Sequence, residues 1–189
     1  MIDPHYAALE RYAALDAWNE LIRTTYGEAG KYQIETLMER MALGLFKWLP
    51  KWTILVGDSG TGKSTLIRII WRMFYADEQI IGVSSRNPMN LGQYNDESLG
   101  ICDDADVDHM YKEVEEKWSG KYHLLIATNK EPDSDILEND AEVWIIRPTG
   151  QKISSERYME LVETIYDGIF ELRLYFCEKG GMDYVKRWL

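Results

Sequence analysis

Residues 57–65 read Gly-Asp-Ser-Gly-Thr-Gly-Lys-Ser-Thr, which matches the phosphate-binding pattern G-x-x-x-x-G-K-[ST] at every required position. The apolar run 53–56 before this stretch predicts a short buried strand, and residues 66–71 after it predict a helix. Glycines let the backbone curl so that its N–H groups face an anion, and the N-terminus of the helix adds partial positive charge. A glycine-rich turn that carries a lysine by chance would not require a strand and a helix at its ends. The stretch therefore predicts an α/β fold with a loop that binds a triphosphate.

The same loop indicates which groups contact the nucleotide. The Lys63 ammonium is expected to reach the β- and γ-phosphates, and the Ser64 hydroxyl is expected to join the ligands of Mg²⁺. ATP and Mg²⁺ are therefore the expected ligands. The residues expected to line the nucleotide site are Gly57, Asp58, Ser59, Gly60, Thr61, Gly62, Lys63, Ser64 and Thr65.

A second pattern follows the apolar residues 99–102, which run directly into Asp103 and Asp104. A buried strand here would deliver both carboxylates at its carboxyl end. Asp103 is the expected Mg²⁺ ligand, and Asp104 is the expected base or orienting group for an attacking water. The alternative is a solvated acidic turn, because Asp106 and Asp108 follow closely.

A third pattern repeats this arrangement at residues 124–128, an apolar run that ends in Asn129. An amide at a strand end can hydrogen-bond both the γ-phosphate and a water, which is the role of a sensor residue. The alternative is an asparagine that only begins a turn before Pro132. Three polar strand ends in series favour a compact hydrolytic site.

The N-terminal part of the chain predicts two helices. Apolar spacing of three and four residues extends over 5–26 and again over 31–48. Gly27 and Gly30 mark the expected turn between them, and Pro50 is the expected end of the second helix. Their apolar residues are explained by packing, with self-association in a helical bundle as the functional alternative.

The C-terminal part predicts a long final helix over 155–178, ended by glycines at 180 and 181. We therefore expect three segments. Residues 1–50 form a helical oligomerisation or packing segment, residues 51–149 form the core, and residues 150–189 form a helical segment that packs on the core.

Strands alternate with helices in the central segment. Apolar runs predict further strands over 79–83, 99–102, 122–127 and 142–147, with a helix over 106–117. This alternation predicts a mainly parallel sheet flanked by helices, with the ligand at the carboxyl ends of the strands. The expected fold is thus an α/β P-loop NTPase core with an N-terminal helical bundle and a long C-terminal helix.

The net charge of −11 is unevenly distributed along the 189 residues. Residues 96–116 contain nine acids and one lysine, and residues 131–142 contain six acids and no base. The remainder of the chain has a slight excess of bases, so the overall charge does not exclude a nucleic-acid partner.

Other sequence features indicate the compartment. No run approaches about 18 consecutive apolar residues, so no membrane association is expected. The first residues lack the pattern of a secretion signal. The two cysteines, Cys102 and Cys177, are expected to be reduced thiols in the cytoplasm or nucleus. The three histidines lie too far apart for a zinc-binding pattern.

The three ordered motifs resemble motifs A, B and C of superfamily 3 helicases, the AAA+-related ATPases of viral and plasmid replication proteins. The resemblance covers about residues 50–150 and rests on residues 57–65, 94–104 and 124–129. It implies a ring, usually hexameric, assembled through a helical bundle that residues 5–48 would supply. It also implies ATP-driven work on single-stranded DNA or RNA. Members are usually fused to an origin-binding or nicking domain, so a separate replication protein is a further expected partner.

The family places a hairpin with basic residues just before motif C, at residues 117–123 of this chain. Lys117, Lys121 and His123 are therefore candidates for nucleic-acid contact. An ordinary loop between a helix and a strand, with solvated lysines, is the alternative.

The resemblance also implies an arginine that completes the site of a neighbouring subunit. Arg147 follows a predicted strand and is the expected residue, with Arg157 and Arg86 as alternatives. An Arg147 that forms an ion pair within its own chain is an equal possibility.

Three other functions are compatible with the motifs. An ATP-switched helicase loader or partner-remodelling ATPase would use ATP for assembly. A P-loop small-molecule kinase would need a lid with several arginines, yet Arg147 is the only arginine between residues 121 and 152. A scaffold that has lost hydrolysis would not need Lys63, Ser64, Asp103 and Asp104 together.

Overall fold

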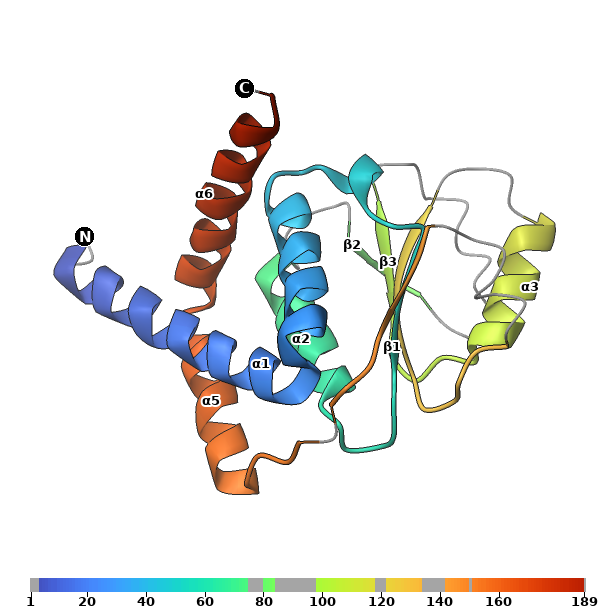
Figure 1. Cartoon of the computed structure of the whole chain (residues 1–189), viewed down its shortest axis with the longest axis horizontal. Coiled ribbons are helices and arrows are strands. Elements are labelled where there is room, and N and C mark those ends of the chain that lie inside the picture. Colours follow the sequence, from blue (N-terminus) through green and yellow to red (C-terminus); the bar gives the residue numbers. More distant parts are fainter. Residues whose placement is uncertain are drawn as a thin grey trace. The chain divides into compact units, whose positions relative to one another are not determined.

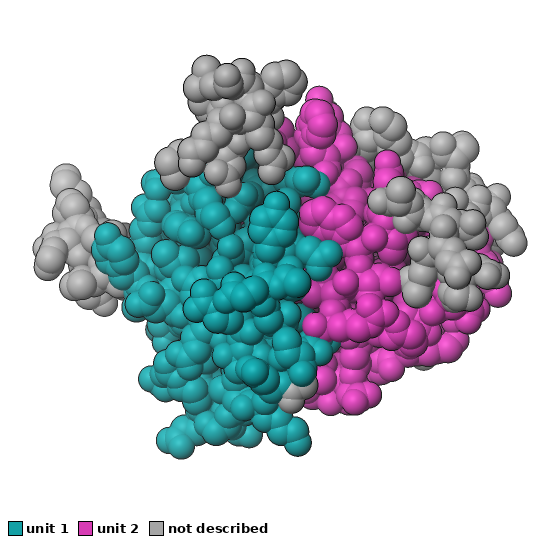
Figure 2. Space-filling model, viewed as in Figure 1, with its two compact units in different colours: residues 1–44, 148–189 teal, residues 45–147 magenta. Residues whose placement is uncertain are grey.

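The structure, a computed structural model, describes residues 4–74, 80–83, 98–117, 122–133, 142–149 and 151–188, without the side chains of 4–10, 115–117 and 182–188. The chain divides into two compact units, residues 1–44 with 148–189 and residues 45–147 (Figure 2). The three segments expected from the sequence stay a prediction, and the helices of the first and last segments lie in the same unit.

The unit formed by residues 45–147 contains a parallel sheet. Its five described strands lie in the order β2-β3-β4-β1-β5, and every pairing between neighbours is parallel (Figure 1). The strands are β1 (Trp52–Val56), β2 (Ile80–Gly82), β3 (Leu99–Cys102), β4 (His123–Thr128) and β5 (Val143–Ile146). The α/β class and the parallel sheet predicted from the sequence are confirmed. Residue 79, the expected start of β2, lies outside the described residues.

The inner strands are apolar because both faces of the sheet are covered. Every residue of β1, β3 and β4 is buried. Alternate residues Trp52, Ile54 and Val56 of β1 share a core cluster with residues of α3 (Val107–Lys117), while α2 (Lys63–Phe74) lies on the other side of the sheet (Figure 1).

The register places the strand ends that carry the motifs next to one another. Val56 of β1 is opposite Thr128 of β4, and Cys102 of β3 is opposite Ile126 of β4. The loops that follow these three strands therefore leave the same edge of the sheet, where ligands of parallel α/β sheets bind.

The other unit begins with α1 (Pro4–Ala42), which is kinked at Gly27, where φ is 69° and ψ is −178°. The predicted turn at Gly27 is thus a kink, whereas Gly30 lies within the helix. The break releases backbone carbonyls that need new partners. Thr149 supplies them, because its N–H donates to the Thr25 carbonyl at 2.8 Å and its hydroxyl donates to the Thr24 carbonyl at 3.0 Å.

The predicted end of this helical region near residue 48 is wrong. The helix ends at Ala42, and a short 3₁₀ helix follows at Phe46–Trp48. Gly44 adopts a φ of 66°, the left-handed conformation that commonly ends a helix, and its N–H donates to the Met41 carbonyl at 3.0 Å.

The single long C-terminal helix is also corrected. Two helices are present, α5 (Ser155–Asp167) and α6 (Ile169–Trp188), separated at Gly168. The helix α6 continues through Gly180, which serves close packing: a Cβ there would lie 3.0 Å from the Cβ of Glu39. Among the described helices, none combines the length and apolar content that crossing a bilayer requires.

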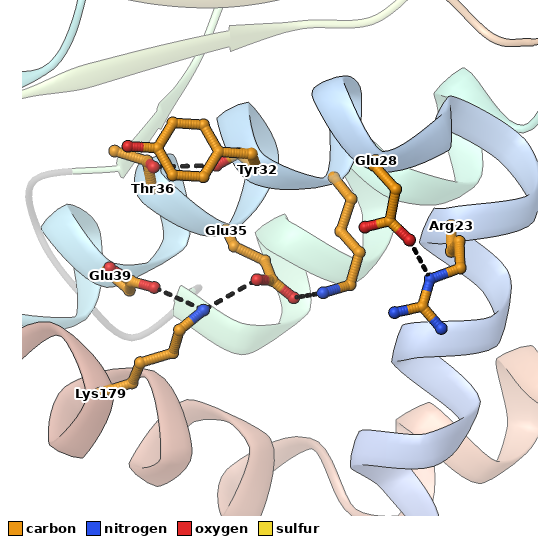
Figure 3. A network of polar contacts seen from close by, with 8 residues as sticks. Arg23, Glu28, Tyr32, Glu35, Thr36, Glu39 and Lys179 are labelled. Carbon is orange, nitrogen blue, oxygen red and sulfur yellow. Dashed lines mark hydrogen bonds and ion pairs between the residues drawn. The ribbon is translucent and has the colours of Figure 1, made fainter.

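A polar network around the buried Glu35 joins α1 to α6 (Figure 3). The Glu35 carboxylate lies 2.8 Å from Lys31 Nζ and 2.8 Å from Lys179 Nζ, and Lys179 also pairs with Glu39 at 2.9 Å. Burial opposes ionisation of Glu35, but the two lysines outweigh it and lower the pKa of this carboxyl. The network therefore holds a charged carboxylate between two helices.

Candidate functional site

The loop between β1 and α2 has the backbone geometry that its glycines permit. Gly60 and Gly62 adopt φ angles of 81° and 88°, which residues with a Cβ rarely reach. The N–H of Gly57 donates to the Thr128 carbonyl at 3.3 Å, so the start of the loop is fixed to the end of β4. The helix α2 begins at Lys63, directly after the loop, so its first N–H groups, which lack acceptors within the helix, lie at the end of the loop.

The Lys63 side chain lies inside this loop and is buried, with 5% of the residue exposed. Its ammonium donates to the carbonyl oxygens of Gly57 at 2.6 Å and Asp58 at 2.7 Å. It also donates to Oδ1 of Asn129 at 2.9 Å, which brings the first and third motifs together. Burial lowers the pKa of Lys63, against the opposing effect of carboxylates including those of Asp58 and Asp103.

Ser64, the next residue of α2, connects the first motif to the second. Its hydroxyl donates to Oδ1 of Asp103 at 2.8 Å, although the two residues are 39 positions apart. Both side chains are exposed at the carboxyl edge of the sheet. Hydroxyl and carboxylate oxygens are the hard ligands that Mg²⁺ prefers, so this donor set fits the ion.

Asp104 follows β3 with a φ of 57°, and it has the only positive φ of a non-glycine residue among those the structure describes. Aspartate tolerates this left-handed conformation better than most residues, and such backbone outliers cluster at functional sites. The next residue, Ala105, donates its N–H to the Ala127 carbonyl at 2.9 Å. The loop after β3 is thereby attached to the C-terminal end of β4.

Asn129 lies in a tight turn directly after β4. The Lys130 N–H donates to the Thr128 hydroxyl oxygen at 3.1 Å, which closes the turn around Asn129. Asn129 therefore takes part in a turn, which was the alternative left open by the sequence. The same turn directs its amide toward Lys63, so the turn does not exclude a role of Asn129 in the site.

Arg147 lies directly after β5 and pairs with Glu131, two residues beyond Asn129. Both side chains are about half exposed, 50% and 56%. Arg147 thus forms an ion pair within its own chain, which was the alternative to a role in the site of a neighbouring subunit. Of the other candidates, Arg157 pairs with Glu20 at 2.6 Å and Arg86 lies outside the described residues.

The proposed hairpin before motif C is only partly described. Lys121 and the side chain of Lys117 lie outside the described residues. His123 is the first residue of β4 and is buried, with Nδ1 3.1 Å from the Pro50 carbonyl oxygen. This burial argues against direct contact between His123 and a phosphate.

Sequence reasoning missed Asp108, which it treated as part of a solvated acidic turn. Asp108 lies in the first turn of α3, where an acid suits the helix dipole, and is 8% exposed. Its carboxylate contacts Lys130 and accepts the Asp133 N–H at 3.0 Å. The one signal in the sequence was an acid near the start of a predicted helix. The partners of Asp108 could not be predicted, because they lie in a loop more than 20 residues later.

The described residues contain no group of three or more His, Cys, Asp or Glu side chains placed to bind a metal. This finding leaves the predicted Mg²⁺ site open, because Mg²⁺ commonly uses one or two protein ligands besides the phosphates. Comparison of the chain with protein-family models and with curated proteins finds no significant match.

Proposed function

We propose that this protein is a Mg²⁺-dependent ATPase whose site lies at the carboxyl edge of the sheet, between β1, β3 and β4. One observation carries the proposal. Lys63 and Ser64, adjacent residues of α2, hydrogen-bond Asn129 and Asp103 respectively, so that three separate sequence motifs meet at one place. A glycine-rich turn with an incidental lysine does not require this convergence.

The roles of the residues follow from their positions. The loop N–H groups and Lys63 bind the phosphates, since an anion at a helix N-terminus is stabilised by both charge and hydrogen bonds. Ser64 and Asp103 hold Mg²⁺, which when bound neutralises phosphate charge. Asp104 accepts a proton from the attacking water, and Asn129 orients that water against the γ-phosphate.

We further propose that ATP hydrolysis serves work on nucleic acid, as a helicase or translocase of viral or plasmid replication. This part rests on the resemblance of the motifs to superfamily 3 helicases. It includes assembly of the subunits into a homo-oligomeric ring. Single-stranded DNA or RNA is the proposed substrate, and a separate replication protein is a further proposed partner. The expected compartment is the cytoplasm, or the nucleus of a host.

Two measurements test the proposal at its two levels. Phosphate release from ATP with Mg²⁺ and without any phosphate acceptor is expected of an ATPase, whereas a small-molecule kinase would release little. Strand displacement or single-strand-stimulated turnover is expected of a motor. ATP-dependent assembly without unwinding would instead favour the loader or partner-remodelling ATPase.

A further inference from the structure

Asp108 is a buried carboxylate that no step of the proposed reaction uses. It lies in the first turn of α3, four residues beyond Asp104, and 8% of the residue is exposed. One carboxylate oxygen accepts the N–H of Asp133 at 3.0 Å, and the other contacts the Lys130 ammonium. Both partners belong to the loop that begins with Asn129.

The two contacts of Asp108 differ in expected strength. Lys130 has 69% of its side chain exposed, so water screens its ion pair, and such pairs contribute little. The bond from the Asp133 N–H ends on a carboxylate that is buried, where a charge-assisted hydrogen bond is stronger. Burial opposes ionisation of Asp108, but the bonds from Lys130 and Asp133 outweigh it and lower the pKa of this carboxyl.

A second contact joins the segment between β3 and α3 to β4 itself, on the N-terminal side of Asn129. Ala105, directly after Asp104, donates its N–H to the Ala127 carbonyl at 2.9 Å. The chain around Asn129 is therefore attached to the segment 105–108 both before Asn129, at Ala127 of β4, and after it, at Lys130 and Asp133. These attachments fix the Asn129 turn relative to Asp103 and Asp104.

We infer that Asp108 is a positioning residue of this ATPase, which holds the loop 130–133 so that the Asn129 amide keeps its place beside Lys63. The inference rests on the proposed function. Asp108 touches neither nucleotide nor water in this scheme, and it acts through Asn129. Its loss lowers turnover and leaves nucleotide binding intact, since the loop Gly57–Thr65 and α2 do not depend on it.

The test measures kcat for ATP hydrolysis and the Kd of a non-hydrolysable ATP analogue for a set of variants. Asp108→Ala is expected to lower kcat about 10-fold or more, because small displacements of an orienting group are costly, while Kd changes less than about twofold. Lys130→Ala is expected to change kcat less than about twofold, because it removes only the screened pair. Asp108→Asn can still accept the Asp133 N–H and is expected to lower kcat only about threefold.

Asp106→Ala is the matched control. The Asp106 carboxylate accepts the N–H of His109 at 3.2 Å at the start of α3, but it is exposed and, among the described residues, makes no hydrogen bond to the loop 130–133. This variant removes a hydrogen bond at the start of α3 and keeps both contacts of Asp108 with the loop 130–133. An equal loss of kcat in Asp106→Ala would show that helix stability explains the effect and would overturn the inference.

A double variant separates positioning from general damage. In an Asn129→Ala background, Asp108→Ala is expected to cause no further loss of kcat, because the residue through which it acts is gone. Additive losses would overturn the inference. If Asp108→Ala does not fold, Asp108→Asn replaces it, with a loss of about threefold expected that again vanishes without Asn129.

Failure of the inference and failure of the proposed function give different results. Normal turnover by Asp108→Ala in a protein whose wild type hydrolyses ATP overturns the inference alone. A wild type that neither binds the analogue nor hydrolyses ATP overturns the proposed function, and the inference with it.

Discussion

The Nζ atom of Lys63 lies 2.9 Å from Oδ1 of Asn129, a residue 66 positions later in the chain. The two residues follow neighbouring strands, β1 and β4, whose ends are aligned by the pairing of Val56 with Thr128. The contact joins the loop that is expected to bind phosphate with the amide that is expected to sense it. Several consequences of this arrangement can be measured.

Replacing Asp104 by asparagine is expected to abolish hydrolysis and to preserve ATP binding. The amide keeps the size of the side chain but cannot accept a proton, and loss of a general base typically costs 10²- to about 10⁴-fold in rate. Phosphate release and analogue affinity measure the two effects. Asp106→Asn, an exposed acid two residues later, is the control and should turn over normally. Normal turnover by Asp104→Asn would place the base elsewhere.

Replacing Ser64 by alanine is expected to weaken the Mg²⁺ dependence of nucleotide binding. The change removes the hydroxyl that lies 2.8 Å from Asp103, and loss of one ligand or its support commonly costs about 10-fold or more in metal affinity. A Mg²⁺ titration of phosphate release measures the shift. Ser64→Thr retains the hydroxyl and should behave as wild type, since the motif accepts either residue. Equal Mg²⁺ dependence in the alanine variant would remove Ser64 from the metal site.

Mixing two inactive variants tests whether Arg147 acts on a neighbouring subunit. Its ion pair with Glu131 is half exposed and therefore weak enough to exchange for another anion. If Arg147 acts in trans, combining Arg147→Ala with Lys63→Ala is expected to restore part of the ATPase activity. Each mixed interface can then pair an intact loop with an intact arginine. No recovery over a range of mixing ratios would leave Arg147 as a residue of its own chain.

Glu35→Gln is expected to destabilise the helical unit by about 1–3 kcal/mol at neutral pH, because it removes a buried acceptor of two charged hydrogen bonds. The folded-state pKa of Glu35 is lowered below its ordinary value of 4.5, so its contribution is present above that value. The contribution is lost as the pH falls through the lower folded-state pKa. Denaturant unfolding as a function of pH should therefore show a flatter acid limb in Glu35→Gln.

Glu28→Gln is the control for this prediction. Glu28 pairs with Arg23 on the same helix, but both side chains are largely exposed, 72% and 58%. Its replacement is expected to change the free energy of unfolding by less than about 0.5 kcal/mol. Equal effects of the two variants would show that the burial of the Glu35 network has no energetic consequence.

The strands and the edge of the sheet that holds the motifs were predictable from the sequence. Parallel strands covered on both faces appear as uninterrupted apolar runs, and residues 99–102 and 124–127 are runs of this kind. The polar residues that end them were therefore placed at one edge without knowledge of the strand order. The contact of Lys63 with Asn129 could not be predicted without the strand order, because it depends on β4 lying beside β1.

The helix ends were less predictable because they depend on local φ angles and on packing. Gly44 ends α1 although the apolar spacing continues to residue 48. Gly180, by contrast, lies within α6 because the helix approaches Glu39 closely there. A glycine is compatible with both outcomes, and the sequence does not distinguish them. Asp108 was missed for a similar reason, since its partners are set by the tertiary fold.

The most direct test of the central claim is phosphate release from ATP by the wild-type protein and by Lys63→Ala, measured with and without Mg²⁺. Lys47→Ala, which removes an exposed lysine of the same unit, is the matched control. We predict Mg²⁺-dependent turnover by the wild type and by Lys47→Ala, and neither nucleotide binding nor turnover by Lys63→Ala. Turnover by Lys63→Ala equal to that of the wild type, or no turnover by the wild type, would contradict the claim that these three strand ends form an ATP-hydrolysing site.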